Sequence, residues 1–356
     1  MRFTLYPISW VADPHLDPEP FDHNLLPFDV TENVRIESLE GRFRPDAFAL
    51  GADRHGAEIR ENLEEVRYAL VHRYDPRPVF QNGEYVGDLQ FDQHSETLVR
   101  EVMACLRLVR PMRARALVIK GRVREADESF DVTGYDIPPL HLLEVPEVQK
   151  LFKLRNQDCL ELRRYAPLFR EAMAQGVWKF KMAVQFHELG HFQCLDWKAR
   201  CLLWGSAIES IFTTNSRNHQ GTTVATERIK WFLGENTSIY APGDLTEFDD
   251  DPHITVGDIV KAWYNVRNHL AHGDRIPDIY FLQEARHAIG GAVNAMEFLI
   301  EGASFLIRSS LLKILRDRLS HHFVDAAAAE SYFDANNLTN SKIRARQHAA
   351  ILAGRP

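Results

Sequence analysis

The stretch 256–273, VGDIVKAWYNVRNHLAHG, predicts a helix that ends at its final glycine. Its apolar side chains recur at helical spacing, at Val260, Trp263, Tyr264 and Val266. Gly273 follows the last turn, and glycine stops helices readily because it adopts left-handed backbone angles without strain. We expect this helix over 256–271. Similar patterns predict further helices at 146–154, 167–194, 197–212, 223–233 and 281–319. Amphipathic helices joined by short links favour an up-and-down bundle.

The N-terminal part of the chain carries mixed signals. Segments rich in β-branched or aromatic residues predict strands at 2–10, 33–39 and 116–123. Helical periodicity occurs at 57–72 and 96–109. Frequent Pro and Gly residues separate these elements. The pattern indicates an α+β arrangement and leaves its topology open.

The length of 356 residues suggests two domains that each bury a core. We expect an α+β domain at 1–150, an all-α helical bundle at 151–335 and a basic tail at 336–356, which makes the fold mainly α. The tail is predicted to be a small basic arm or a frayed final helix. With 45% hydrophobic and 26% charged residues, the composition excludes a disordered chain.

The cysteine pattern and the longest apolar stretch bear on location. The four cysteines, Cys105, Cys159, Cys194 and Cys201, lack the short paired spacing of a zinc ribbon or a redox motif. A reducing cytoplasm fits this usage. The apolar stretch 288–307 contains Glu297 and Glu301, so it is interpreted as a core helix rather than a membrane span. We therefore expect a cytoplasmic protein without a membrane partner.

Residues 187–191 have the sequence HELGH, which matches the H-E-x-x-H motif of zinc hydrolases. On a helix this spacing places His187 and His191 one turn apart, and Glu188 can then act as general base toward a metal-bound water. A catalytic zinc needs a third protein ligand, and the usual downstream extension is missing. We interpret both histidines as ordinary residues of a bundle helix and expect no metal or other cofactor. A zinc hydrolase stays a weak alternative.

A basic segment runs from 107 to 124 without an acidic residue. If its second half is a strand, Lys120 and Arg122 lie on one face, and a solvated strand face is the simplest interpretation. The alternative is a weak RNA-binding patch that comprises Arg113, Arg115, Lys120 and Arg122. The net charge of −8 argues against a general nucleic-acid coat but not against a small cationic site.

Two strings match the motifs of one family. In LLWGSAIESIF (202–212), the segment from Ala207 matches a helix ending in A-[LI]-E-x-[LI]-[LF]. The matches to a later Y-x-x-R-[NS]-x-x-x-H-G motif are Tyr264, Arg267, Asn268, His272 and Gly273. In this order and spacing, the strings resemble the HEPN superfamily, and within it the Apea-like branch. The resemblance covers roughly 180–334 and does not extend to the first 150 residues.

The resemblance implies a helical bundle that commonly forms homodimers and, in many members, acts as a metal-independent endoribonuclease. It implies catalytic roles for Arg267, His272 and Asn268, and supporting roles for Glu209, Tyr264 and His269. It also implies RNA as the substrate and a bacterial toxin or anti-phage defence setting. Some members carry a modified Tyr two residues after the motif His. Asp274 occupies that position here, so we do not expect that regulation.

The chemistry of metal-free RNA cleavage agrees with these residue types. It needs a base for the 2′-hydroxyl, an acid for the leaving 5′-oxygen and a cation for the phosphate. Histidine transfers protons near neutral pH, and arginine binds phosphate bidentately. Taken alone, however, the Arg267–His272 string equally fits a charged helix C-terminus.

Helix geometry sets a condition on this site. Five residues along a helix rotate by about 500°, or about 140° net, so Arg267 and His272 share a face only if the helix ends between them. Gly273 makes such an ending plausible. One histidine also cannot be base and acid at once, so we expect a second motif from a partner copy.

The alternative is a catalytically silent HEPN module that binds RNA, nucleotide or a protein partner. The N-terminal domain is a further candidate for a protein contact.

Overall fold

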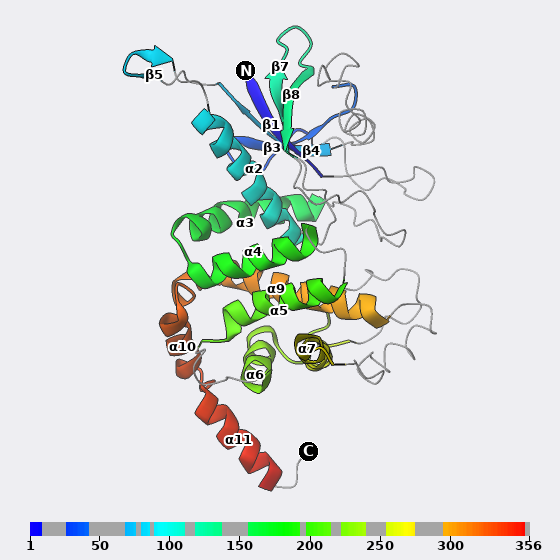
Figure 1. Cartoon of the computed structure of the whole chain (residues 1–356), viewed down its shortest axis with the longest axis vertical. Helices are drawn as coiled ribbons and strands as arrows, with labels where there is room; N and C mark the ends of the chain where they lie inside the picture. Colours follow the sequence, from blue (N-terminus) through cyan, green and yellow to red (C-terminus); the bar gives the residue numbers. More distant parts are fainter. Residues whose placement is uncertain are drawn as a thin grey trace. The chain divides into compact units, whose positions relative to one another are not determined.

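The computed structural model divides the chain into two compact units, Met1–Arg170 and Glu171–Pro356 (Figure 1). The residues it describes are 1–8, 26–42, 68–75, 80–85, 89–110, 118–136, 156–192, 197–214, 222–239, 254–274 and 295–352. The division falls inside helix α3 (Asn156–Ala174) rather than at the expected residue 150. Its first half belongs with the N-terminal unit because Arg163 lies 4.0 Å over the Phe28 ring and donates to the Asp29 carbonyl at 2.7 Å.

The first unit contains an antiparallel sheet whose described strands run in the order β2-β3-β4-β1-β7-β8. They are β1 (Arg2–Pro7), β2 (Phe28–Asp29), β3 (Val34–Ser38), β4 (Tyr68–Tyr74), β7 (Val118–Val123) and β8 (Phe130–Asp136). A separate hairpin pairs β5 (Phe80–Gln81) with β6 (Glu84–Tyr85). The strands expected at 2–10, 33–39 and 116–123 are confirmed over β1, β3 and β7.

One face of this sheet packs against helix α2 (Leu89–Val109), which confirms the helix expected at 96–109. Polar contacts fix the pairing: Ser95 of α2 donates to Thr4 of β1 at 2.8 Å, and Arg107 donates to the Tyr6 hydroxyl at 2.8 Å. The opposite face is an apolar core that includes Phe3, Leu5 and Phe130. Strand alternation therefore separates the two faces cleanly.

The helix expected at 57–72 is wrong where the structure describes it, because Tyr68–Tyr74 is strand β4. This strand pairs with β3 on one side and β1 on the other, and residues 68–72 are buried. A short strand buried on both faces is apolar without alternation, so periodicity alone does not separate it from a helix. Pairing with both neighbouring strands makes this segment a strand rather than a helix.

The second unit is helical. Its elements are α4 (Trp178–Phe192), α5 (Trp197–Phe212), α6 (Thr222–Leu233), α7 (Val256–His272), α9 (Ala295–Arg316), the short 3-10 turn η5 (Ser320–His322), α10 (Ala326–Ala335) and α11 (Asn340–Leu352). Helix α4 packs along α5, and α9 contacts α4, α5, α6 and α7. The described part of the chain is thus mainly α, with an antiparallel sheet in the first unit, as expected. None of the described helices is long and apolar enough to cross a membrane.

The helix boundaries are partly as predicted. The helices at 197–212, 223–233 and 256–271 are confirmed as α5, α6 and α7. Of the helix expected at 281–319, α9 covers Ala295–Arg316. Residues 275–294 and the helix expected at 146–154 lie outside the described residues.

The single helix expected at 167–194 is wrong, because α3 and α4 are separate helices over this range. Gly176 adopts φ 67° between them, and the amide of Val177 donates back to the carbonyl of Ala172 at 3.3 Å. This left-handed residue ends α3 as a C-terminal glycine does. The apolar periodicity continues across the break, which is why the sequence pattern concealed it.

Candidate functional site

Helix α7 is defined sharply at both ends. Thr255 caps its N-terminus in a capping box with Asp258, whose carboxylate accepts from the Thr255 amide at 2.9 Å. Gly273 ends the helix with φ 73° and ψ 17°, and the next amide, Asp274, donates to the carbonyl of His269 at 2.9 Å. The predicted role of Gly273 as the helix stop is confirmed. The two caps fix where the polar residues at the end of α7 lie.

Arg267 of α7 lies against helix α5. A Cβ atom at Gly205 would stand 3.3 Å from Cγ and Nε of Arg267, so the absence of a side chain there lets the arginine approach. One turn further along α5, both Glu209 oxygens lie 2.9 Å from Arg267 Nη2. Arg267 Nη1 also donates to Asn268 Oδ1 at 3.3 Å. The GSAIE segment of α5 therefore accommodates and contacts the Arg267 side chain.

The groups around this ion pair are poorly solvated. Burial raises the pKa of the Glu209 carboxyl, and the charge of Arg267 opposes that rise. Burial, with a contribution from the negative charge of Glu209, raises the pKa of the Tyr264 hydroxyl above its usual range. Among the described residues, neither the Tyr264 hydroxyl nor Arg267 Nε has a hydrogen-bond partner. Unpaired buried polar atoms are rare in folded proteins, so those beside Arg267 mark it as a candidate binding site.

His272 is the last residue of α7, and its side chain is exposed. The helix continues regularly through His272, so an ending between Arg267 and His272 does not occur. The two residues therefore stay about 140° apart around the helix. In the part of the chain that the structure describes, no hydrogen bond or ion pair joins them. One chain thus directs the arginine toward α5 and the histidine toward solvent.

The other predicted residues at this helix end have mixed surroundings. His269 Nδ1 lies 3.9 Å from a carboxylate oxygen of Asp274. Asn268 contacts Arg267, as described above. The structure brings together Glu209, Tyr264, Arg267 and Asn268, and it leaves His272 apart from them.

The HELGH histidines face each other inside α4. His187 is fully buried, and its Nε2 lies 3.1 Å from Nε2 of His191. The Trp204 ring of α5 covers both imidazoles, and its Nε1 donates to the His187 carbonyl at 3.2 Å. A Cβ at Gly190 would stand 2.3 Å from Trp204 Nε1, so this glycine admits the indole. Glu188 Oε1 lies 3.7 Å from His187 Nδ1.

A search of the described residues for three or more His, Cys, Asp or Glu side chains that could hold a metal finds no such group. The histidine pair therefore lacks a third ligand within that part of the chain, and its contacts are those of a helix–helix interface.

In the described parts of the basic segment, 107–110 and 118–124, several cations contact other groups of the first unit. Lys120 donates to Glu96 of α2 at 2.6 Å, and Arg124 lies 3.3 Å from Asp131 of β8. Arg122 is exposed on β7. Arg113 and Arg115 lie outside the described residues. Lys120 thus contributes to the sheet–helix contact instead of forming an open cationic surface with Arg122.

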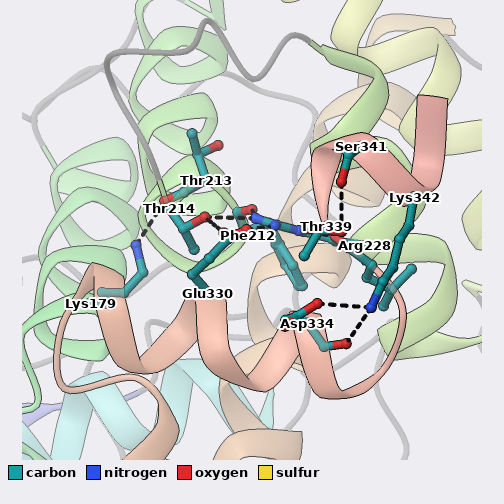
Figure 2. A network of polar contacts seen from close by, with 11 residues as sticks. Lys179, Phe212, Thr213, Thr214, Arg228, Glu330, Asp334, Thr339, Ser341 and Lys342 are labelled. Carbon is teal, nitrogen blue, oxygen red and sulfur yellow. Dashed lines mark hydrogen bonds and ion pairs between the residues drawn. The ribbon is translucent and has the colours of Figure 1, made fainter. Parts of the chain in front are cut away.

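Sequence reasoning missed a buried arginine, Arg228 of α6 (Figure 2). Its side chain is 0% exposed. Its acceptors are the Leu338 carbonyl at 3.0 Å, the Phe212 carbonyl at 2.9 Å, Thr214 Oγ1 at 3.0 Å and Glu330 Oε2 at 2.9 Å. The guanidinium also lies 4.4 Å over the Phe333 ring. The available signal was its position midway between Val224 and Phe232, at helical spacing on the apolar face of α6.

A second cation lies in the same network. Lys179 of α4 donates to the Thr213 carbonyl at 2.9 Å. Burial, and next the charge of Arg228, lower the pKa of Lys179 to about 8. Thr214 also donates to the Glu330 carboxylate, so hydroxyl, carboxylate and guanidinium form a closed set (Figure 2). This network joins α5, α6 and α10 and has the character of a structural core.

A scan against protein-family models, a search of curated proteins and a search of solved structures each found no match to this chain. Function is therefore argued from the site itself.

Proposed function

We propose that the second unit is a HEPN-type, metal-independent endoribonuclease in which Arg267 binds the scissile phosphate and His272 transfers protons. The observation that carries the proposal is the end of α7. There, Arg267 is held by Glu209 while its Nε lacks a partner among the described residues, and an exposed histidine follows on the same helix. The motif resemblance at these residues supports the same assignment. A role in bacterial toxicity or anti-phage defence rests on that resemblance alone.

The reaction needs only groups that these residue types provide. A neutral imidazole removes the 2′-hydroxyl proton, and the 2′-oxygen attacks the adjacent phosphorus. The bond from phosphorus to the 5′-oxygen breaks, and a protonated imidazole supplies the proton to the leaving oxygen. The arginine stabilises the charge that develops on the phosphate oxygens. The products are a 2′,3′-cyclic phosphate and a free 5′-hydroxyl.

Two copies of the chain complete this chemistry. Within one chain Arg267 and His272 are on different sides of α7, and one histidine cannot be base and acid in the same step. A two-fold axis near the end of α7 would place the exposed His272 of each copy next to the other copy's site. The proposed active form is therefore a homodimer, with RNA as substrate and with Tyr264, Glu209 and His269 as positioning residues.

The test is cleavage of single-stranded RNA by the purified full-length protein in EDTA. We expect fragments with 2′,3′-cyclic phosphate ends, and a loss of at least about 100-fold in rate for His272→Ala and for Arg267→Ala. His94→Ala is the matched control, because His94 is an exposed histidine on α2 and its replacement should leave the rate unchanged. Full cleavage by both His272→Ala and Arg267→Ala would refute the assignment.

A second candidate is a catalytically silent module that binds RNA, nucleotide or a protein partner. The specific observation in its favour is that Glu209 already neutralises Arg267 within one chain. RNA binding without cleavage, across single-stranded and structured substrates, would select this candidate. A rate that falls in EDTA and returns with zinc would instead revive the hydrolase interpretation of His187, Glu188 and His191.

A further inference from the structure

Four aromatic rings from three elements of the second unit form a continuous row. Trp231 of α6 contacts Tyr332 of α10, with ring centroids 6.0 Å apart. Tyr332 contacts His322 of η5 at 4.7 Å, and His322 contacts His321 at 3.8 Å. We call Trp231, Tyr332, His322 and His321 the aromatic row. None of these residues belongs to the site at the end of α7.

The aromatic row is accessible on one side and supported on the other. Trp231 is 44% exposed, His321 is exposed, and the other two rings are half-buried. Behind the row, Tyr332 contacts the buried rings of Phe232, Phe323 and Phe333 at 5.5–6.5 Å. A large exposed indole backed by a packed core is pre-organised for stacking, because little side-chain freedom remains to be lost on binding.

The charges near the row favour an anionic occupant. Helix α11 contacts α6, the helix that carries Trp231. It contains Lys342, Arg344 and Arg346, and no acidic residue occurs between 338 and 356. Of the described side chains of α11, most are exposed and Ile343 is buried. Figure 1 shows α11 (red) extending from the end of α10.

Two acids near Tyr332 are already paired. Asp317 lies 2.8 Å from Arg316 and 3.8 Å from Lys313. Asp334 of α10 lies 2.9 Å from Lys342. Repulsion of a phosphate chain by these two acids is therefore reduced, and the exposed Arg344 and Arg346 of α11 add positive charge.

We propose that the aromatic row and α11 bind single-stranded RNA, with bases stacked on Trp231 and His321 and phosphates contacted by Arg344 and Arg346. Aromatic platforms beside cationic surfaces are the means by which proteins bind single strands, whereas a duplex keeps its bases stacked inside. The identity of the nucleic acid as RNA rests on the proposed ribonuclease function. The surface then holds the substrate strand at a place separate from the catalytic residues.

The experiment measures binding apart from cleavage. A fluorescein-labelled 2′-O-methyl oligouridine of about 12 nucleotides cannot be cleaved by 2′-oxygen attack, and its anisotropy reports binding to the full-length protein. We expect Trp231→Ala to weaken binding roughly five- to 100-fold. Arg344→Ala should lower the slope of log K against log salt by about 0.7, the value for one phosphate contact.

Trp178→Ala is the matched control, because Trp178 is also an exposed tryptophan, at 60%, on the same unit. It should bind like the wild type. Thermal unfolding of each variant verifies that the fold persists. Trp231→Ala and Arg344→Ala proteins that are folded and bind like the wild type would overturn the proposal, as would a preference for blunt duplex RNA or for an acidic peptide.

Failure here is distinguishable from failure of the ribonuclease assignment. His272-dependent cleavage with unaltered binding by Trp231→Ala rejects the aromatic row alone. Binding that depends on Trp231, in a protein that cleaves no RNA, rejects the ribonuclease and retains the row.

Discussion

Arg228 and Arg267 each join two helices of the second unit through a glutamate at 2.9 Å, yet their surroundings differ. Arg228 is 0% exposed, and each of its three guanidinium nitrogens has an acceptor. Arg267 is 24% exposed, and its Nε has no partner among the described residues. A fully satisfied buried arginine stabilises a fold, whereas an incompletely satisfied one at the surface retains capacity for a ligand. Arg228 is thus a structural arginine, whereas Arg267 is a candidate for ligand binding.

The largest expected difference is in stability. Arg228→Ala removes a donor from the Glu330 carboxylate and from the carbonyls of Leu338 and Phe212. Because the arginine is fully buried, the loss should reach about 3–5 kcal/mol. Arg267→Ala breaks a pair whose side chains are 24% and 33% exposed, and it should cost less, about 1–3 kcal/mol. Urea unfolding followed by circular dichroism measures both free energies. Equal losses in the two variants would show that the two arginines do not differ in the way proposed.

A smaller effect is expected when the contact between Gly205 and Arg267 is changed. Gly205→Ala places a methyl group against the Arg267 side chain at 3.3 Å, so the guanidinium must shift by a few tenths of an ångström. We expect RNA cleavage to slow about tenfold, because catalysis is sensitive to small displacements. Stability should change little, because the gain of about 1 kcal/mol in helix propensity offsets the close contact with Arg267 and with the Trp263 ring, which also lies 3.3 Å from the added atom.

Ser206→Ala is the matched control for that substitution. Ser206 is the next residue of α5, and its hydroxyl donates to the Leu202 carbonyl within the same helix. Its replacement should leave cleavage unchanged. A Gly205→Ala protein that cleaves RNA at the wild-type rate would mean that the position of Arg267 against α5 does not matter for the proposed activity.

The smallest effect concerns pH. Because the pKa of Lys179 is lowered to about 8, the folded protein releases this proton at a lower pH than the unfolded chain does. Between about pH 8 and pH 10.5 the unfolded state binds more protons, so the contribution of Lys179 to stability rises with pH. The free energy of unfolding should therefore rise less, or fall more, in Lys179→Met than in the wild type over this interval. Parallel pH profiles would place Lys179 in solvent.

Much of the candidate site was predictable because it depends on local rules. The helix stop at Gly273 follows from backbone conformation, and the apolar face of α7 follows from spacing. From the sequence, Arg267 and Glu209 were linked only because each lies in one of two motifs of the same family. Its physical basis, the approach of α7 to Gly205, depends on packing between helices that are distant in the sequence.

The parts that sequence reasoning missed depend on tertiary context. The break at Gly176 interrupts a periodic apolar pattern that continues on both sides. The pattern therefore predicted one helix although a glycine ends α3. The segment Tyr68–Tyr74 forms a strand because it pairs with β1 and β3. Arg228 looks like a surface residue by type, and its burial depends on acceptors from α5, α10 and the segment before α11.

The contact between Arg228 and the Leu338 carbonyl has a consequence for the order in which the chain folds during synthesis. The guanidinium is made with α6, but one of its acceptors is made 110 residues later. Until that residue has left the ribosome, the nascent bundle contains a cation whose hydrogen bonding is incomplete. We expect the full stability of the second unit to arise late in translation, when the segment that leads into α11 is added.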